Sequence, residues 1–437
     1  MTITLHRPNQ IGGCITEIVS STGTKIIVDL GHKLPRGDEE APDEYASPGA
    51  VAELTKGASA IFYTHMHGDH VELFHYVPDG IDQYIGPLAR NIMIAKYDHM
   101  SHAREQQVKE DCLSRIKKLE AFKTYHKGWS IRVGDITVVP FQVSHSSADS
   151  YMLLIKCDGK TILHTGDFRG HGYMGEGIYK VVDKFHIAGH VDVLITEGTN
   201  VDNKGKSVRP ESALKEDFKK VFGDFKNNFI LCSSTDADRL ESIFSADRDG
   251  AKRPFFVDAY QKDLIGLISQ QAEEKRRVYH FGGLTIYGYN PKVAKMEKLM
   301  RWKGFVMLIR NNTTFQKYLD EHILQFCKPE ESCLVYSMYH GYIDKKMSAF
   351  QEKTYNFVEQ FRKRGFAFEE IHTSGHASKQ DLVRLCEQVN PGIIIPIHKD
   401  EFADFKKILP DELKLKVCEK NFSEDGLVVS FIPGHEV

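Results

Sequence analysis

Short apolar runs rich in valine and isoleucine recur through the first half of the chain and predict β-strands. These runs are "TKIIVDLG" at 24–31, "ASAIFYTH" at 58–65, "DITVVPFQVSH" at 135–145, "KTILHTGD" at 160–167 and "VDVLITEG" at 191–198. Between some of them the apolar residues follow helical spacing, most clearly from about residue 89 to 121. The first half of the chain is therefore predicted to be rich in sheet, with helices in its connections.

The pattern changes after Asn200. A turn-rich segment at 201–210 precedes an alternation of helical and strand patterns, which predicts a small parallel α/β unit. Strand patterns of the earlier kind return at 366–374 and 392–398. We therefore expect an α/β protein of the α+β sandwich type, with one discontinuous domain at 1–204 and 369–437 and an inserted domain at 205–368.

The composition is that of an ordinary globular chain, with 437 residues, 41% hydrophobic and 27% charged. No stretch is long and apolar enough to span a bilayer, and the N-terminus lacks a secretory signal pattern. These features predict a cytoplasmic protein without a membrane partner. The eight cysteines form no C-x-x-C pair, which predicts buried and unreactive thiols.

The net charge of −3 is unevenly distributed along the chain. Residues 201–368 contain 29 Lys and Arg against 22 Asp and Glu, so this segment carries +7 and the remainder −10. A basic segment within an acidic chain fits a polyanion path facing a carboxylate-rich centre. Random variation in surface charge is an equally good explanation of this imbalance taken alone.

Polar residues recur immediately after the apolar strands. Strand ends that converge on one edge of a sheet are places where binding and catalytic sites are built. One such histidine would ordinarily be structural, but seven cases of the same kind indicate a site. The seven residues are Asp29, His65, His145, Asp167, Glu197, His372 and His398.

The segment "HMHGDH" carries the strongest chemical signal. His65, His67, Asp69 and His70 offer nitrogen and oxygen donors, which suit a catalytic Zn²⁺ with an open position. In an extended turn the first two histidines point one way, while Asp69 and His70 turn to the other side, so one motif can serve two metals. Asp167 in "HTGDF" is the candidate bridging carboxylate. The alternative is a coincidental cluster.

These residues resemble the motifs of the metallo-β-lactamase superfamily. The ordered set comprises Asp29, "HMHGDH", His145 and Asp167, while Glu197, His376 in "SGHAS" and His398 in "IPIHKD" resemble the additional motifs of the β-CASP branch. The resemblance extends over nearly the whole chain and is greatest to the ribonuclease J family. It implies a metallo-β-lactamase αββα sandwich with an inserted β-CASP domain.

The resemblance also implies individual roles. One Zn²⁺ would be held by His65, His67 and His145. The other would be held by Asp69, His70 and His398, with Asp167 bridging and Mn²⁺ able to substitute. Asp29 would orient a ligating histidine, and Asp69 counts as a catalytic residue as well as a ligand. Glu197 and His376 would form a catalytic pair near the scissile phosphate.

Four serines are weaker candidates for substrate binding. Ser233 and Ser234 lie at a predicted strand-to-helix junction, where they would either hold a phosphate or cap the helix. Ser374 and Ser378 flank His376 and could donate hydrogen bonds to a terminal phosphate.

The favoured hypothesis is a two-zinc ribonuclease that hydrolyses RNA phosphodiester bonds in the 5′→3′ direction, with endonuclease activity left open. The resemblance favours RNA because a histidine at the position of His398 marks RNA-cleaving members, whereas DNA-repair members carry valine. Three alternatives stay open: a hydrolase of a small ester or thioester, a DNA nuclease, and an inactive RNA-binding scaffold. The oligomeric state is also open, with a homodimer as one option.

Overall fold

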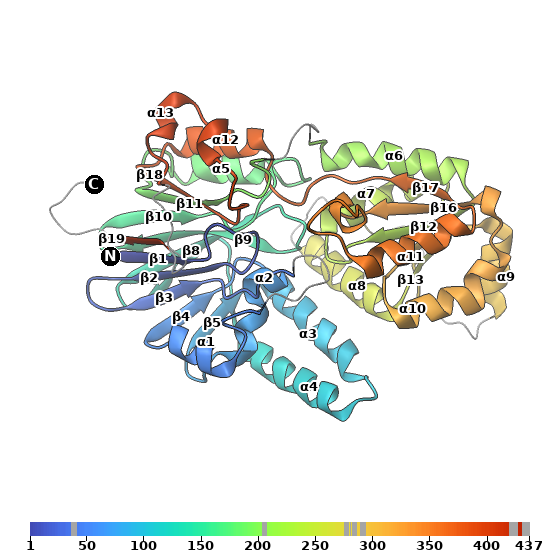
Figure 1. Ribbon diagram of the computed structural model, residues 1–437, viewed down its shortest axis with the longest axis horizontal. Coiled ribbons are helices and arrows are strands. Elements are labelled where there is room, and N and C mark those ends of the chain that lie inside the picture. Colours follow the sequence, from blue (N-terminus) through green and yellow to red (C-terminus); the bar gives the residue numbers. More distant parts are fainter. Residues whose placement is uncertain are drawn as a thin grey trace. The chain divides into compact units, whose positions relative to one another are not determined.

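A computed structural model gives the fold of this protein, and it describes residues 1–35, 42–202, 208–274, 279, 281, 286–288, 294–418 and 427–430. The contacts within the chain separate two compact units (Figure 1). The first unit comprises Met1–Leu34, Pro42–Val208 and Gly375–Val437, and the second comprises Pro35–Ala41 and Arg209–Ser374. The boundary expected at residue 205 lies outside the described residues, and the division into domains stays a prediction.

The first unit contains two sheets. In one, β1, β2, β3 and β19 pair antiparallel while β4, β5 and β6 continue the sheet in parallel. Its order is β19 (Leu427–Ser430), β1 (Thr2–His6), β2 (Ile15–Val19), β3 (Lys25–Val28), β4 (Ala58–Phe62), β5 (Asp82–Ile85) and β6 (Lys123–Thr124). The other has the order β18 (Ile393–Ile397), β11 (Val193–Glu197), β10 (Lys160–His164), β9 (Ser150–Cys157), β8 (Ile136–Val143) and β7 (Ile131–Val133).

The two sheets pack face to face. Buried residues from both sheets, including Ile3, Ile26, Leu153 and Ile395, form one apolar cluster between them. A second cluster lies on the outer face of the first sheet under α1, α3 and α4, and a third lies on the outer face of the second sheet under α5 and α12. The helices of this unit are α1 (Pro48–Leu54), α2 (Gly68–Val71), α3 (Pro87–Ser101), α4 (Gln106–Glu120), α5 (Gly177–Lys184), α12 (Lys379–Val389) and α13 (Asp411–Lys414).

The helical pattern expected from 89 to 121 is divided into two helices. Helix α3 ends at Ser101 and α4 begins at Gln106. Tyr97 from α3 and Leu119 from α4 enter the same apolar cluster over the first sheet. The break lets the second helix fold back beside the first, so both bury their apolar faces on one sheet.

The second unit is built on one parallel sheet, as expected for this part of the chain. Its order is β14 (Ile286–Gly288), β13 (Phe255–Val257), β15 (Phe305–Ile309), β12 (Asn227–Cys232), β16 (Ser332–Ser337) and β17 (Ala367–Glu370). Its helices are α6 (Glu211–Asp224), α7 (Ala237–Arg248), α8 (Ala259–Glu274), α9 (Ala294–Lys303), α10 (Thr313–Tyr318) and α11 (Glu352–Lys363).

The strand β17 differs from the sequence-based expectation. Its sequence pattern resembles the strands of the first domain and was expected to mark the return of the chain to that domain. The strand instead pairs in parallel with β16 of the second unit. The second unit accordingly extends to Ser374. A sheet sandwich between helices, together with a parallel α/β unit, confirms the expected fold class. Among the described residues, no helix combines the length and the apolar character that a membrane crossing requires.

Candidate metal centre

The predicted site residues gather where strands of the first unit end. Asp29 follows β3, His65 follows β4, Asp167 follows β10 and His398 follows β18. His145 follows β8, and Glu197 is the last residue of β11, whereas His372 belongs to the second unit. Because these strand ends meet at one edge of the sandwich, residues distant in sequence become neighbours.

The "HMHGDH" segment leaves β4 as a tight turn. His67 is the N-terminal cap residue of the short helix α2, yet its side chain makes no capping hydrogen bond. Gly31 permits the turn to approach the end of β3, because a Cβ at Gly31 would lie only 1.7 Å from the carbonyl oxygen of Asp69. A side chain at residue 31 would therefore displace the motif.

Asp167 occupies the middle of the cluster and is 2% exposed. Its Oδ2 atom lies 3.9 Å from Nε2 of His65 and 3.8 Å from Nε2 of His145. The same oxygen lies 3.2 Å from Nε2 of His70 and 3.7 Å from Nε2 of His398. One carboxylate oxygen is thus close to histidines of both predicted ligand sets, which is the placement that a bridging ligand requires.

Three histidines form one group near Asp167. Nitrogen atoms of His65, His67 and His145 all lie within 4.8 Å of one another. Nδ1 of His145 donates to the carbonyl of Gly375 at 2.7 Å, which leaves the Nε2 lone pair directed toward the cluster. Nδ1 of His67 lies 3.2 Å from that Nε2 atom.

A second group contains His70, His398 and Asp69. Nε2 of His398 lies 3.2 Å from Oδ2 of Asp69, and Nε2 of His70 lies 3.9 Å from the same oxygen. Nδ1 of His70 donates to Oδ2 of Asp29 at 2.8 Å. Asp29 and His398 both have positive φ angles, 61° and 49°, which residues with a Cβ seldom adopt. This backbone strain is consistent with a functional site.

Two nitrogen atoms in the cluster show that a cation fits it. Nε2 of His65 and Nε2 of His70 are buried and have no hydrogen-bond partner. An unsatisfied buried polar atom is costly, so such atoms ordinarily belong to a site that a ligand completes. Imidazole and carboxylate donors together suit Zn²⁺. The residues present therefore fit a zinc centre.

The electrostatics agree with that fit. Burial lowers the pKa of His65 well below its usual value, and the neighbouring imidazoles lower it further. The pKa of His145 is lowered for the same reasons. Both rings are therefore neutral and offer lone pairs. Burial opposes protonation of His70 as well, but the nearby carboxylates, with Asp167 foremost, outweigh it and raise its pKa. These carboxylates favour positive charge at the centre.

His376 and Glu197 form a hydrogen-bonded pair beside the cluster. Nδ1 of His376 donates to Oε2 of Glu197 at 3.1 Å and lies 3.5 Å from Oδ2 of Asp167. Oε1 of Glu197 accepts from the backbone N–H groups of Phe168 and Ala377, so the carboxylate is held rigidly. Burial acts to lower the pKa of His376, but Glu197 and Asp167 outweigh it and raise the pKa to about 9.

Replacing Asp29 tests the positioning of His70. Asp29 is fully buried and also accepts hydrogen bonds from the backbone N–H and the hydroxyl of Thr64. We expect Asp29→Ala to weaken binding of one metal ion by about 10–100-fold, because His70 loses the partner that orients its ring. Zinc affinity is to be measured by competition with a chelator. Asp247→Asn, which alters a buried carboxyl of the second unit, is the matched control, and unchanged zinc affinity in Asp29→Ala would contradict the assignment.

The four candidate serines have different surroundings. The Oγ atom of Ser378 caps α12: it accepts from the N–H of Asp381 at 3.0 Å and donates to the carboxylate of Asp381 at 2.8 Å. The cap of α7 is Asp236 rather than Ser233 or Ser234. Ser233, Ser234 and Ser374 belong to the second unit. Phosphate binding by any of the four stays a prediction.

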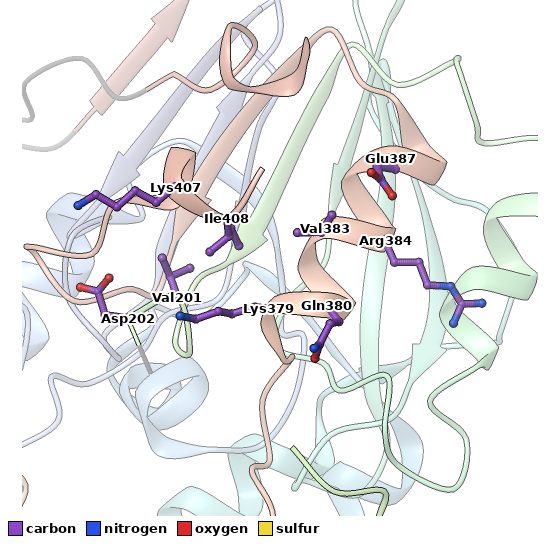
Figure 2. Close-up of a pocket in the computed structure, with 9 residues that line it drawn as sticks. All are labelled: Val201, Asp202, Lys379, Gln380, Val383, Arg384, Glu387, Lys407 and Ile408. Carbon is purple, nitrogen blue, oxygen red and sulfur yellow. The ribbon is translucent and has the colours of Figure 1, made fainter. Parts of the chain in front are cut away.

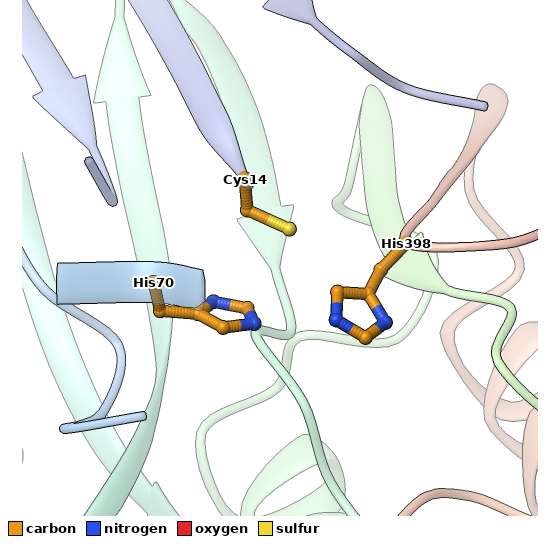
Figure 3. A group of neighbouring side chains, drawn as sticks. All are labelled: Cys14, His70 and His398. Atoms are coloured by element: carbon orange, nitrogen blue, oxygen red, sulfur yellow. The ribbon is translucent and has the colours of Figure 1, made fainter. Parts of the chain in front are cut away.

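Side chains that were not singled out in the sequence also contact the site. Oγ1 of Thr64 lies 3.0 Å from Nδ1 of His65, and Oγ1 of Thr199 lies 2.8 Å from Nδ1 of His398. The sulfur of Cys14 lies near His70 and His398 (Figure 3). Thr64 directly precedes "HMHGDH" and Thr199 lies two residues after Glu197, so both could have been found by adjacency, whereas Cys14 has no such signal.

A cavity of about 660 Å³ lies beside α12 (Figure 2). Its lining includes none of the predicted site residues, so the cavity is separate from the metal centre. The lining combines three basic side chains with apolar and acidic ones. It consists of Val201, Asp202, Lys379, Gln380, Val383, Arg384, Glu387, Lys407 and Ile408.

Comparison with known proteins identifies the class. Residues 366–417 match the family model of the Zn-dependent metallo-hydrolase RNA specificity domain. A crystal structure of a protein of unknown function from Enterococcus faecalis V583 superposes with a TM-score of 0.72 at 18% identity, over 98% of this chain and 99% of the other, which shows the shared fold. The fold and the site together resemble those of metallo-β-lactamase proteins of the β-CASP type.

Within that class the chain is ribonuclease J-like. It is 22% identical to ribonuclease J of Helicobacter pylori (strain ATCC 700392 / 26695) over 436 residues, covering 95% of this chain and 58% of the relative. It is 22% identical to ribonuclease J of Sinorhizobium meliloti over 381 residues, covering 85% of this chain and 63% of that relative. The chain thus spans less than two thirds of the length of these relatives.

Proposed function

We propose that this protein is a zinc-dependent ribonuclease with a two-metal centre. In this proposal His65, His67 and His145 hold one Zn²⁺, Asp69, His70 and His398 hold the other, and Asp167 bridges them. The observation that carries the proposal is the position of Asp167, whose Oδ2 atom lies within 3.9 Å of histidines from both groups. The buried, unpartnered Nε2 atoms of His65 and His70 support it.

The centre suits hydrolysis of a phosphodiester. Two divalent ions bound there would lower the pKa of a shared water and neutralise charge on the reacting phosphate. The protein's own contribution is to hold the ligands. Asp29, Thr199 and the carbonyl of Gly375 each contact Nδ1 of a ligating histidine, so that Nε2 faces the centre.

His376 is proposed as the proton donor, or as the clamp on the scissile phosphate. Hydrolysis leaves negative charge on the departing 3′ oxygen, which leaves more readily when a nearby group protonates or binds it. Glu197 accepts from Nδ1 of His376, which favours the protonated ring and orients Nε2 for contact with the substrate.

RNA is the proposed substrate class, and 5′→3′ exonucleolytic cleavage is the proposed mode. The chain is similar to proteins named ribonuclease J and to an RNA specificity domain. This similarity supports RNA as the substrate over DNA and over small esters. A cytoplasmic location accords with this proposal. The oligomeric state, including a homodimer, and Mn²⁺ as a substitute for Zn²⁺ stay predictions.

The proposal is tested by incubating the purified protein with 5′-monophosphorylated RNA, 5′-hydroxyl RNA and DNA of the same sequence. We expect RNA to be degraded, activity to be lost after chelation and activity to return with Zn²⁺, because the hydrolytic water depends on the metal. Product sizes read from a gel distinguish stepwise removal from the 5′ end from internal cleavage.

Each alternative has its own outcome in this assay. Cleavage of DNA alone would indicate a DNA nuclease. Metal-dependent hydrolysis of a thioester or lactone with intact RNA would indicate a small-molecule hydrolase. RNA binding without hydrolysis under any metal would indicate an inactive scaffold.

A further inference from the structure

Cys14 places a sulfur atom at the metal centre. It lies just before β2, is 5% exposed, and its Sγ atom lies within 4.8 Å of ring nitrogens of both His70 and His398. Figure 3 shows the sulfur pointing into the space between the two imidazole rings. Among the described residues that form potential metal-binding groups, Cys14 is the only cysteine.

The backbone holds Cys14 in this position. Its N–H donates to the carbonyl of Asp69 at 3.0 Å, and its own carbonyl accepts from the N–H of Gly31 at 3.1 Å. Cys14 is therefore tied directly to the "HMHGDH" segment and to the loop that carries Asp29. The sulfur and the imidazole of His70 belong to one rigid arrangement.

His70 indicates that a metal ion binds beside the sulfur of Cys14. Its Nδ1 atom donates to Asp29, so Nε2 is the ring nitrogen left for a metal, and that buried atom has no hydrogen-bond partner. Nε2 of His398 faces the same space and lies 3.2 Å from Asp69. A cysteine that merely fills an apolar gap need not lie near any other donor atom, whereas the sulfur of Cys14 lies within 4.8 Å of two imidazole nitrogens.

We propose that Cys14 supplies a sulfur ligand to the metal position shared by His70 and His398. This inference rests on the two-metal centre proposed above. Thiolate ligands favour Zn²⁺, whereas Mn²⁺ prefers oxygen donors. Cys14 would therefore make the two metal positions chemically unequal, with the second one selective for Zn²⁺ over Mn²⁺. This selectivity would come from Cys14 and not from the histidine and aspartate ligands.

The protein, stripped of metal and loaded with Co²⁺, tests the proposal by absorption spectroscopy. Sulfur bound to Co²⁺ gives a near-ultraviolet charge-transfer band that nitrogen and oxygen ligands do not give. We expect this band in the unaltered protein, its loss in Cys14→Ser, and its retention in Cys157→Ser, a buried cysteine at the end of β9. Cys14→Ser should also weaken binding of the second Zn²⁺ by at least about 10-fold.

Competition between equal concentrations of Zn²⁺ and Mn²⁺, read by elemental analysis, provides the second measurement. The unaltered protein should retain Zn²⁺ at the second position, and Cys14→Ser should admit more Mn²⁺. Two bound Co²⁺ ions without the sulfur band would overturn the role of Cys14 and leave the two-metal centre standing. Absence of any bound metal would overturn both. If Cys14→Ser fails to fold, the spectrum of the unaltered protein decides by the presence or absence of the band.

Discussion

His398→Ala is expected to remove one of the two metal ions and to abolish RNA cleavage. His398 is 1% exposed, and its Nε2 atom lies 3.2 Å from Asp69 and 3.7 Å from Asp167. Without the imidazole, one ion loses a nitrogen ligand and no longer binds. The two-metal centre that would activate the hydrolytic water is then incomplete. Retention of the ion bound by the three-histidine group is expected.

Metal content by elemental analysis and the rate of RNA cleavage are to be measured on the same preparation. His126→Ala is the matched control, because His126 is an exposed histidine of the same unit outside the cluster, and it should leave both quantities unchanged. Two bound metals and full activity in His398→Ala would contradict both the ligand assignment and the proposed two-metal ribonuclease.

His376→Ala is expected to keep both metal ions and RNA binding while slowing cleavage by about 10²–10⁴-fold, the usual cost of losing a positioned proton donor. The reason is its position at the edge of the cluster. Its Nδ1 atom is hydrogen-bonded to Glu197, and His376 belongs to neither of the two proposed sets of metal ligands. Single-turnover cleavage rates, zinc content and RNA affinity separate chemistry from binding.

Glu197→Gln should lower the cleavage rate in the same direction but by a smaller factor, because the amide no longer favours protonated His376. Glu53→Gln, at an exposed carboxylate on α1, serves as its control. Loss of metal or of folding in His376→Ala would instead assign the residue a structural role. A folded variant with full metal content and the normal cleavage rate would contradict both roles.

Much of the architecture could be predicted from the sequence because strand patterns depend on local residue choice. The apolar run ending at Phe62 is β4, and the runs at 160–167 and 191–198 contain β10 and β11. The alternation after Asn200 correctly indicated a parallel α/β unit. Val and Ile in short runs favour the extended backbone wherever they pack, so these elements need no tertiary information to be recognised.

Other features were decided by packing between distant segments. Nothing in residues 102–105 is a glycine or a proline, yet the chain turns there so that α3 and α4 share one face of the sheet. The strand β17 has the same local character as strands of the first unit, but it joins β16. Local pattern specifies a strand without specifying its neighbour, because the pairing depends on which edge the chain reaches.

The sequence by itself determined which residues could carry the chemistry: the clustered "HMHGDH" donors, Asp167 and the strand-end His398 all stand out by residue type and spacing. Only the tertiary structure decided which of them meet. Asp69 and His398 are 329 residues apart in the chain and 3.2 Å apart in space, because β4 and β18, which belong to two sheets packed face to face, end at the same edge of the sandwich. Cys14 shows the same principle most plainly. A lone cysteine beside two glycines carries no signal, and its proposed role as a ligand rests on the two histidines that folding places near its sulfur.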